Sequence, residues 1–141
     1  FENLDEMLAS EEFSKSKIPP PFNVVKKNLV DTGANIYLYK GNTKDTLPNL
    51  IERLPDMDII FIDGGHSIEC IKNDWKYAQK VMDKNTTVIF DDFWNRQDAG
   101  CREVVENIDR SKFEVKILPI QDRFKKEWGL LKINFVSVKK R

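Results

Sequence analysis

The sequence predicts an α/β domain whose sheet is mostly parallel, with helices on both faces and an antiparallel strand pair at the C-terminal end. Two uninterrupted apolar runs, Ile59 to Ile62 and Val88 to Phe90, favour strands buried on both faces, as in parallel sheets. Stretches with helical spacing alternate with these runs, and such alternation is typical of α/β domains. We expect residues 1–141 to form one domain, because this length is typical of a single folded unit.

The first half of the chain is predicted to contain two helices and one strand. Phe22 to Asp31 favours a helix that stops near Gly33, a residue suited to the left-handed conformation that often ends helices. Asn35 to Lys40 is rich in strand-forming residues, and Lys44 to Leu54 carries leucine and isoleucine at helical spacing. Ahead of these elements, the prolines within Ser14 to Pro21 predict an extended linker.

The second half predicts further strands and helices that end in the antiparallel pair. The expected strands are Met57 to Asp63, Thr86 to Phe90, Phe113 to Pro119 and Gly129 to Lys139. The expected helices are Ser67 to Met82 and Ala99 to Arg110. A charged connection that contains Lys125, Lys126 and Glu127 joins the last two strands, which suggests that they run antiparallel.

The charge balance and the apolar content exclude several classes of protein. Lys+Arg and Asp+Glu each number 23, so the chain lacks the basic field that binds nucleic acids or anionic membranes. Apolar residues make up 40% and charged residues 33%, which is typical of a globular domain. No apolar run approaches the roughly 20 residues of a membrane helix. Cys70 and Cys101 lie in predicted helices, which disfavours a disulfide framework or a zinc site, so we expect a cytoplasmic protein.

Acidic and small residues directly follow the predicted strand that ends at Asp63. Ligands of parallel α/β sheets bind beyond the carboxyl ends of the strands. In Asp63-Gly64-Gly65-His66 the glycines permit close approach of a ligand, and His66 is the single histidine of the chain. Its imidazole titrates near neutral pH, which suits proton transfer. The alternative is that these residues form an ordinary turn into the next helix.

Asp91 and Asp92 follow the next predicted strand and add two carboxylates to the same edge. If the two strands are neighbours, they lie about 4.8 Å apart, and Asp63 would converge with one or both of these carboxylates. Converging carboxylates repel unless a proton or a cation lies between them, and Mg²⁺ prefers oxygen ligands. We predict that Asp63, Asp91 and Asp92 hold Mg²⁺. Adjacent strand residues point to opposite faces, so this requires that the strand has already turned; otherwise Asp92 merely caps the next segment.

Gly41 and Asn42 follow the predicted strand Asn35 to Lys40. The Asn42 side chain would either hydrogen-bond a ligand ring or make an Asx turn into the next helix.

These motifs, in this order, resemble those of the class I S-adenosylmethionine-dependent methyltransferases, and most closely the macrocin O-methyltransferase group. The specific part is Phe61 to Ser67, followed by a helix and by Val88 to Asp92. Supporting pieces are Phe1 to Leu4, Gly41 to Pro48 and Ala99 to Arg102. The resemblance implies a Rossmann-like fold.

The resemblance also implies a reaction. S-Adenosylmethionine would lie against Gly41, Asn42, Asp63 and Gly64. Asp63 and the acidic pair would hold Mg²⁺, which would lower the pKa of a substrate hydroxyl. His66 and Asp63 would be catalytic, with His66 as the base, and the hydroxylate would attack the methyl group in line. The implied partner is a small hydroxylated acceptor, a sugar being one candidate, with no nucleic acid or membrane; a homo-oligomer is left open.

One departure from the family sets a further expectation. The glycine-rich turn after the family's first strand, and the acidic residue that ends its second, are absent from the sequence. We expect the domain to lack the first one or two strands of the fold. Either the natural chain then extends beyond Phe1, or re-paired strands or a partner close the gap. Two other functions stay open: a non-catalytic remnant or interaction module, and a metal-dependent hydrolase that activates water with the same carboxylates.

Overall fold

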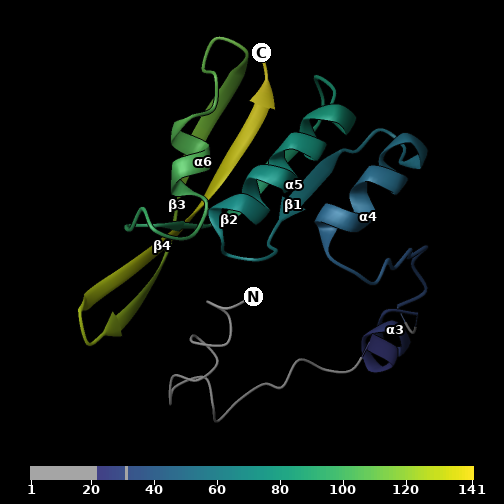
Figure 1. The fold of residues 1–141 in the computed structure, drawn as a ribbon, viewed down its shortest axis with the longest axis horizontal. Coiled ribbons are helices and arrows are strands. Elements are labelled where there is room, and N and C mark those ends of the chain that lie inside the picture. The colour runs from purple at the N-terminus through teal and green to yellow at the C-terminus, as the bar shows by residue number, and fades with distance from the viewer. Residues whose placement is uncertain (1–21, 31) are drawn as a thin grey trace.

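A four-stranded sheet forms the centre of the molecule (Figure 1). The computed structural model describes residues 22–30 and 32–141, so Phe1 to Leu4 and the predicted linker Ser14 to Pro21 lie outside the described residues. The strands are β1 (Ile59–Ile62), β2 (Thr87–Trp94), β3 (Phe113–Lys126) and β4 (Gly129–Lys140). Their order is β1-β2-β4-β3, with β1 parallel to β2 and β4 antiparallel to both β2 and β3. The predicted α/β class and the terminal antiparallel pair are confirmed.

The described helices agree with most of the predicted ones. They are α3 (Phe22–Val30), α4 (Thr43–Leu50), α5 (Ile68–Val81) and α6 (Arg102–Glu106), with a short 3₁₀ helix, η1 (Ile51–Arg53), after α4. Gly33 has a φ of 75°, so α3 is followed by the predicted left-handed residue. None of the helices in the described ranges has the length and apolar character needed to cross a bilayer.

The core lies between one face of the sheet and the helices α5 and α6. Val88, Phe90, Val136 and Val138 are completely buried on that face, because they alternate along β2 and β4. The Trp75 ring of α5 packs 5.6 Å from the Phe90 ring and 5.2 Å from the Phe113 ring, measured between centroids. The remaining buried apolar residues of this cluster are Ile62, Ile71, Ala78, Met82, Phe93, Cys101, Val104, Val105 and Ile108.

The predicted second layer of helices is not seen among the described residues. Ile59 and Phe61 alternate with the buried Ile62 and therefore point to the other face, where they are 68% and 54% exposed. The Phe61 ring lies 6.3 Å from the Phe135 ring, measured between centroids, and the two rings are tilted by 40°. This face of the sheet thus presents apolar side chains at the surface of the described structure.

The prediction of a strand over Asn35 to Lys40 is wrong. These residues belong to no strand, and Tyr37 and Tyr39 are exposed. Strand propensity is realised only against a partner strand, and no described strand pairs with this segment. As a result, the described sheet contains a single parallel pair rather than a mostly parallel arrangement.

The bounds of three other elements also differ from the prediction. β2 continues through Trp94 because β4 pairs with it beyond the acidic residues, as Phe93 with Asn134 and Trp94 with Ile133. β3 likewise continues to Lys126, which leaves Glu127 and Trp128 as the turn. α6 begins only at Arg102, because the amides of Gly100 and Cys101 are bound to groups outside the helix.

Candidate functional site

Three carboxylates meet at the carboxyl ends of β1 and β2. Asp63 follows β1 directly, and Asp91 and Asp92 lie in β2 just past the pair Ile62 and Phe90. One oxygen from each of the three carboxylates lies within 4.8 Å of the others. Asp63, Asp91 and Asp92 are called the acidic trio below. The structure therefore brings together the three residues that the sequence assigns to a metal.

A bulge in β2 makes this convergence geometrically feasible. The register with β4 shifts between Phe90 and Phe93, and Asp92 has a φ of 60°, the left-handed region. In a regular strand, Asp91 and Asp92 would point to opposite faces. A bulge re-aims a side chain, and here the chain turns at Asp92, as a shared ion requires. The amide of Asp92 also donates to Asp91 Oδ1 at 2.6 Å.

The loop before α6 is hydrogen-bonded both to the turn that follows β1 and to the bulge of β2. Gly100 N donates to His66 O at 2.9 Å, and Cys101 N donates to Asp92 O at 3.0 Å. Gly100 has a φ of 77°, and a Cβ at this position would lie 2.4 Å from Asp92 O. Glycine is needed here both for the backbone conformation and for the close approach.

His66 is bonded to the acidic trio through Asp92. Its Nε2 lies 3.0 Å from Asp92 Oδ2, and Trp94 Nε1 donates to Asp92 Oδ1 at 2.9 Å. The rings of His66 and Trp94 are 5.4 Å apart. His66 Nδ1 is buried and has no hydrogen-bond partner in the described structure. Ser67 caps α5 by accepting from Cys70 N at 3.3 Å, so the turn into the helix and the contact with the carboxylates are both present.

The pKa values within the cluster move in opposite directions. Burial raises the pKa of Asp63, and repulsion by Asp92 adds to this effect. Burial also raises the pKa of Asp91, and it outweighs the hydrogen bond from the Asp92 amide, which acts to lower that pKa. Burial acts to raise the pKa of Asp92 as well, but the hydrogen bond from His66 outweighs it and holds that pKa below its usual value. The same bond raises the pKa of His66 despite burial. Asp92 and His66 therefore favour the ionised pair.

The glycine turn between Asp63 and His66 rests on one face of α5. A Cβ at Gly64 would lie 3.2 Å from Asp74 Oδ2, and a Cβ at Gly65 would lie 3.3 Å from Cys70 Sγ. Asp74 is buried, and the sequence reasoning did not single it out. Asp74 lies on the buried face of α5 with Ile71, Trp75 and Ala78. Charged residues are rarely buried, so a carboxylate on the apolar face of the predicted helix is the sequence feature that could have identified it. Residues 70 and 74 stand one helical turn apart, which explains why both glycines are close to the helix.

The predicted cofactor residues Gly41 and Asn42 precede α4. Asn42 Oδ1 accepts from Lys44 N at 3.0 Å, so the side chain caps the helix as in the alternative reading. The next residue, Thr43, lines a cavity of about 340 Å³ together with Asp63 and Gly64. Thr43, Asp63 and Gly64 therefore line one cavity, whereas Gly41 and Asn42 are not among the residues that line it.

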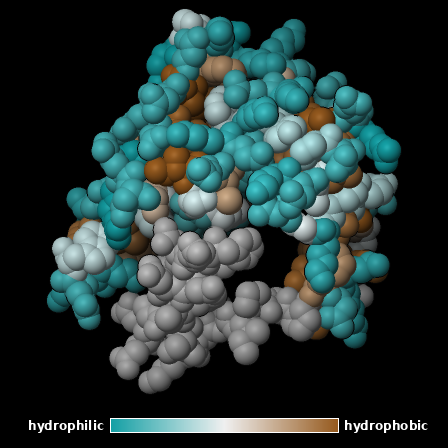
Figure 2. Space-filling model, viewed as in Figure 1, coloured by the Kyte–Doolittle hydropathy of each residue, from teal (hydrophilic) through white to brown (hydrophobic). Residues whose placement is uncertain are grey.

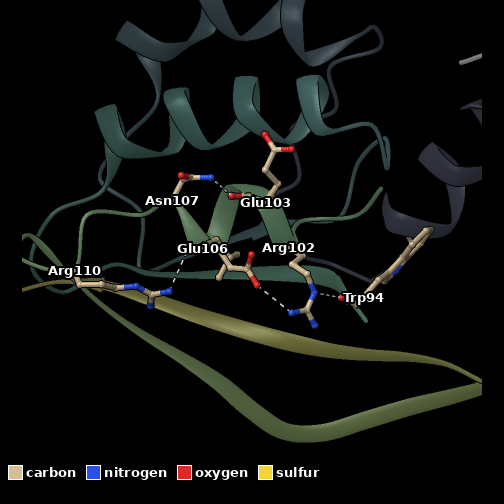
Figure 3. Close-up of polar contacts among 7 residues, drawn as sticks. Trp94, Arg102, Glu103, Glu106, Asn107 and Arg110 are labelled. Carbon is tan, nitrogen blue, oxygen red and sulfur yellow. Dashed lines mark hydrogen bonds and ion pairs between the residues drawn. The ribbon is translucent and has the colours of Figure 1, made fainter. Parts of the chain in front are cut away.

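Arg102 ties α6 to the end of β2 (Figure 3). Its Nε donates to Trp94 O at 2.5 Å, its guanidinium lies 4.4 Å from the centre of the Phe93 ring, and its NH1 pairs with Glu106 at 3.0 Å. At the other end of the helix, Asn107 and Arg110 donate to the carbonyls of residues 103 and 105. These bonds anchor a helix that is only five residues long.

The comparisons with known proteins point to the same edge of the sheet. A family described as "Methyltransferase domain" matches residues 11–93, more than half of the chain. The chain belongs to the methyltransferase-domain family. The match runs from the segment before α3 to the acidic pair of β2 and includes all of Asp63-Gly64-Gly65-His66. The narrower resemblance to the macrocin O-methyltransferase group stays a prediction.

A viral protein is also similar to this methyltransferase domain. An uncharacterized protein of Acanthamoeba polyphaga mimivirus is 30% identical over 98 residues, which is 64% of this chain and 43% of that protein. The chain thus spans less than half the length of this curated relative. No solved structure matches the methyltransferase domain.

The donor set of the site fits a hard divalent ion. The acidic trio offers only carboxylate oxygens, which Mg²⁺ and Ca²⁺ prefer over softer ligands. Two of the three carboxyl groups have pKa values raised by burial, so a cation among them would relieve an unfavourable concentration of negative charge. The donor chemistry of these three residues is therefore compatible with a hard divalent ion.

Proposed function

We propose that the protein transfers a methyl group from S-adenosylmethionine to a hydroxyl oxygen of a small molecule, with Mg²⁺ held by Asp63, Asp91 and Asp92. The observation that carries this proposal is the convergence of the acidic trio beside His66, at the strand ends of a methyltransferase domain. Membership in that family supports S-adenosylmethionine as the donor. A sugar is the acceptor that the resemblance favours.

The reaction requires one bond to form and one to break. The acceptor oxygen bonds to the methyl carbon, the bond from that carbon to the sulfonium sulfur breaks, and the hydroxyl proton leaves. A bound Mg²⁺ would lower the pKa of that hydroxyl. The carboxylate of Asp63 and the glycine beside it would also face the cofactor, together with Gly41 and Asn42. Holding the two reactants in line would supply much of the rate enhancement.

The hydroxyl proton is assigned to the Asp92–His66 pair. To act as the base, His66 must start in its neutral form, in which Nε2–H donates to Asp92 and the lone pair is on Nδ1, an atom that is buried in the structure. The pair keeps Asp92 ionised and orients it toward the other two carboxylates. We therefore expect His66 to matter for turnover more than for metal binding, and Asp63 and Asp91 to matter for metal binding.

Calorimetric titration of the full chain tests the proposal. We expect S-adenosylmethionine to bind, and Mg²⁺ to bind independently of it. Asp63→Asn and Asp91→Asn should each weaken Mg²⁺ binding, since the amide removes one negative charge from the trio. His66→Ala should slow turnover by about 10²- to 10⁴-fold, the usual contribution of a general base, and leave Mg²⁺ affinity nearly unchanged.

Two results would contradict this function. Unchanged Mg²⁺ affinity in both Asp variants would remove the metal assignment. A folded chain that binds Mg²⁺ but not S-adenosylmethionine would not be a methyltransferase on its own. Lys84→Ala is a suitable control, because Lys84 is exposed on a loop at the opposite ends of the strands.

A further inference from the structure

We propose that the end of the β3–β4 hairpin recognises an anionic group, a phosphate or a carboxylate, on the acceptor molecule. The recognising side chains are Arg123, Lys125 and Lys132, called the hairpin cations below. The ligand's role as methyl acceptor rests on the proposed function, whereas the anion site itself does not. Three features carry the proposal: the position of the hairpin end, the distribution of its charges, and the way in which Arg123 is held.

The hairpin end lies beyond the carboxyl end of β2. Trp94, the last residue of β2, pairs with Ile133, so residues 123–132 extend past that strand. Figure 1 shows this end of the hairpin projecting at the lower left, and Figure 2 shows hydrophilic side chains gathered there. Trp94 also donates from its indole to Asp92 Oδ1 at 2.9 Å. The same residue therefore adjoins the acidic trio on one side and the hairpin end on the other.

Asn95 fixes the hairpin end to the segment that follows β2. Its Oδ1 accepts from Lys132 N at 2.8 Å, its Nδ2 donates to Leu130 O at 2.9 Å, and its amide donates to Lys132 O at 3.1 Å. The guanidinium of Arg96, the next residue, lies 4.9 Å from the centre of the Trp128 ring in the turn. These contacts set the position of the hairpin end relative to the chain just past the acidic trio.

The charges of the hairpin end are sorted by face. Directly opposite residues of an antiparallel pair project to the same face, and so do residues two apart along a strand. Arg123 pairs with Lys132, and Lys125 lies two residues beyond Arg123, so the three hairpin cations share one face. Asp122 pairs with Ile133 and projects to the other face. Within the described residues, no carboxylate forms an ion pair with a hairpin cation.

The pairing of Arg123 with Lys132 is unfavourable for the hairpin alone. Like charges directly opposite each other in a sheet are destabilising. The other end of the same hairpin has the favourable arrangement, because Lys139 lies opposite Glu114, and Glu114 also pairs with Lys116 at 2.9 Å. A phosphate or carboxylate bound between Arg123 and Lys132 would replace their repulsion with charge-assisted hydrogen bonds. An anionic ligand therefore accounts for the arrangement.

A polar network holds the Arg123 side chain in place. Its Nε donates to Gln121 Oε1 at 2.9 Å, and Gln121 Nε2 donates to Asn134 Oδ1 at 3.0 Å. Asn134 Nδ2 in turn donates to the carbonyls of Leu118 and Ile120, both at 3.1 Å. The two terminal nitrogens of Arg123 have no partner among the described residues. They suit bidentate contact with a carboxylate or a phosphate.

A small anion fits this surface better than a polyanion does. Nucleic acids and anionic membranes are bound by extended basic fields. The chain carries 23 basic and 23 acidic residues, and the hairpin cations are confined to one short face. The chemistry thus favours an acceptor that carries one anionic group at some distance from the hydroxyl that is methylated.

An NMR titration of the full chain, without added metal and at constant ionic strength, tests the proposal. The probes are glucose 6-phosphate and glucuronate, which carry the two kinds of anionic group, and glucose, which is neutral. We expect at least one anionic probe to shift the signals of Arg123 Nε–H and of the Lys132 amide in a saturable manner. Glucose should leave these signals unchanged. The stronger of the two anionic probes identifies the group that is recognised.

Two variants and a matched control assign the binding to the hairpin cations. Arg123→Gln and Lys132→Gln should each weaken binding of the anionic probe by about tenfold or more, because each removes a hydrogen bond to a charged group. Lys139→Gln removes the same charge from an exposed position of the same strand, at the other end of the hairpin, and should leave the affinity nearly unchanged. The amides of Val88 and Val136, which are completely buried, report that each variant is folded.

Several results would overturn the proposal. Absence of a saturable shift with both anionic probes would mean that the hairpin end holds no anion. Equal weakening by Lys139→Gln and Lys132→Gln would assign the binding to the general field of the protein. Competition between the anionic probe and S-adenosylmethionine in one sample would exclude the acceptor role, since donor and acceptor must bind together. Failure to bind S-adenosylmethionine is a separate result: it contradicts the proposed function and the acceptor role, whereas anion binding that is lost in Arg123→Gln still supports the hairpin site.

Discussion

The His66 imidazole and the Asp92 carboxylate form an ion pair with 3.0 Å between Nε2 and Oδ2, and only 27% and 14% of these two side chains are exposed. The hydrogen bond raises the pKa of His66 and outweighs the effect of burial on Asp92, whose pKa is lowered. His66 follows β1, whereas Asp92 lies in β2, 26 positions later in the sequence. This pair therefore ties the glycine turn to the bulge of β2.

The first prediction concerns the pH dependence of this pair without added metal. The raised pKa of His66 contributes stability that is complete below the unfolded value of about 6.5 and is lost as the pH rises through the folded pKa. The lowered pKa of Asp92 contributes stability that is complete above about 3.9 and is lost as the pH falls through its folded pKa. The stability difference between the natural chain and His66→Gln should thus be largest between these limits and shrink as the pH rises through the folded pKa of His66. Thermal unfolding across pH measures it, and a difference that grows toward alkaline pH would contradict the assignment.

The second prediction compares two glycines with nearly the same backbone conformation. Gly100 (φ 77°) has Asp92 O and the Trp94 ring in the path of a Cβ, whereas Gly33 (φ 75°) has open space. Gly33→Ala should cost about 1 kcal/mol from the left-handed conformation alone. Gly100→Ala should cost clearly more and should also weaken Mg²⁺ binding, because Asp92 must move. Urea titration and calorimetry provide the two readouts. Equal costs would show that the contact with Asp92 is easily relaxed.

The third prediction concerns the buried hydroxyl of Thr86. Its Oγ1 donates to Asp83 Oδ1 at 3.0 Å and accepts from Asp83 N at 2.9 Å, and the residue is completely buried. Thr86→Val keeps the shape but leaves these groups without their partner, which should lower the free energy of unfolding by about 1–3 kcal/mol. Thr87→Val is the matched control, because Thr87 is only half-buried and lies next in the chain. Denaturant unfolding should separate the two variants, and a similar response of both would refute the role of the hydroxyl.

The fourth prediction concerns Trp75 in the core. Its ring packs against Phe90 and Phe113, so Trp75→Ala should cost about 3–5 kcal/mol, the usual range for large-to-small changes in a core. Trp128 is 53% exposed in the β3–β4 turn, and Trp128→Ala should have a much smaller effect. Denaturation followed by circular dichroism compares the variants without relying on tryptophan fluorescence. A small effect at Trp75 would show that the cluster between α5 and the sheet repacks freely.

Local sequence patterns were sufficient for the strands and helices whose partners lie close by. The apolar runs of β1 and β2 and the stripe of α5 predicted the parallel unit that carries Asp63 at its end. The strand at residues 35–40 failed because propensity depends on a partner strand, which the pattern does not reveal. From the sequence, a turn of β2 at Asp92 could be given only as the requirement for Asp91 and Asp92 to bind one ion, and not as a prediction. It depends on the amide of Cys101 and on pairing with β4, and both are distant in sequence.

The bulge at Asp92 determines how much of the chain is needed to form the acidic trio. The family match stops at residue 93, within β2, whereas the strand that sets the register on both sides of the bulge, β4, begins at Gly129. A recombinant fragment cut at the limit of sequence likeness would keep every carboxylate of the trio and His66. It would lose β4, the strand whose pairing with β2 sets the bulge that brings the Asp91 and Asp92 carboxylates together. The acidic trio and His66 lie within the part of the chain that the family matches, but the pairing that sets their geometry comes from β4, which lies outside that match.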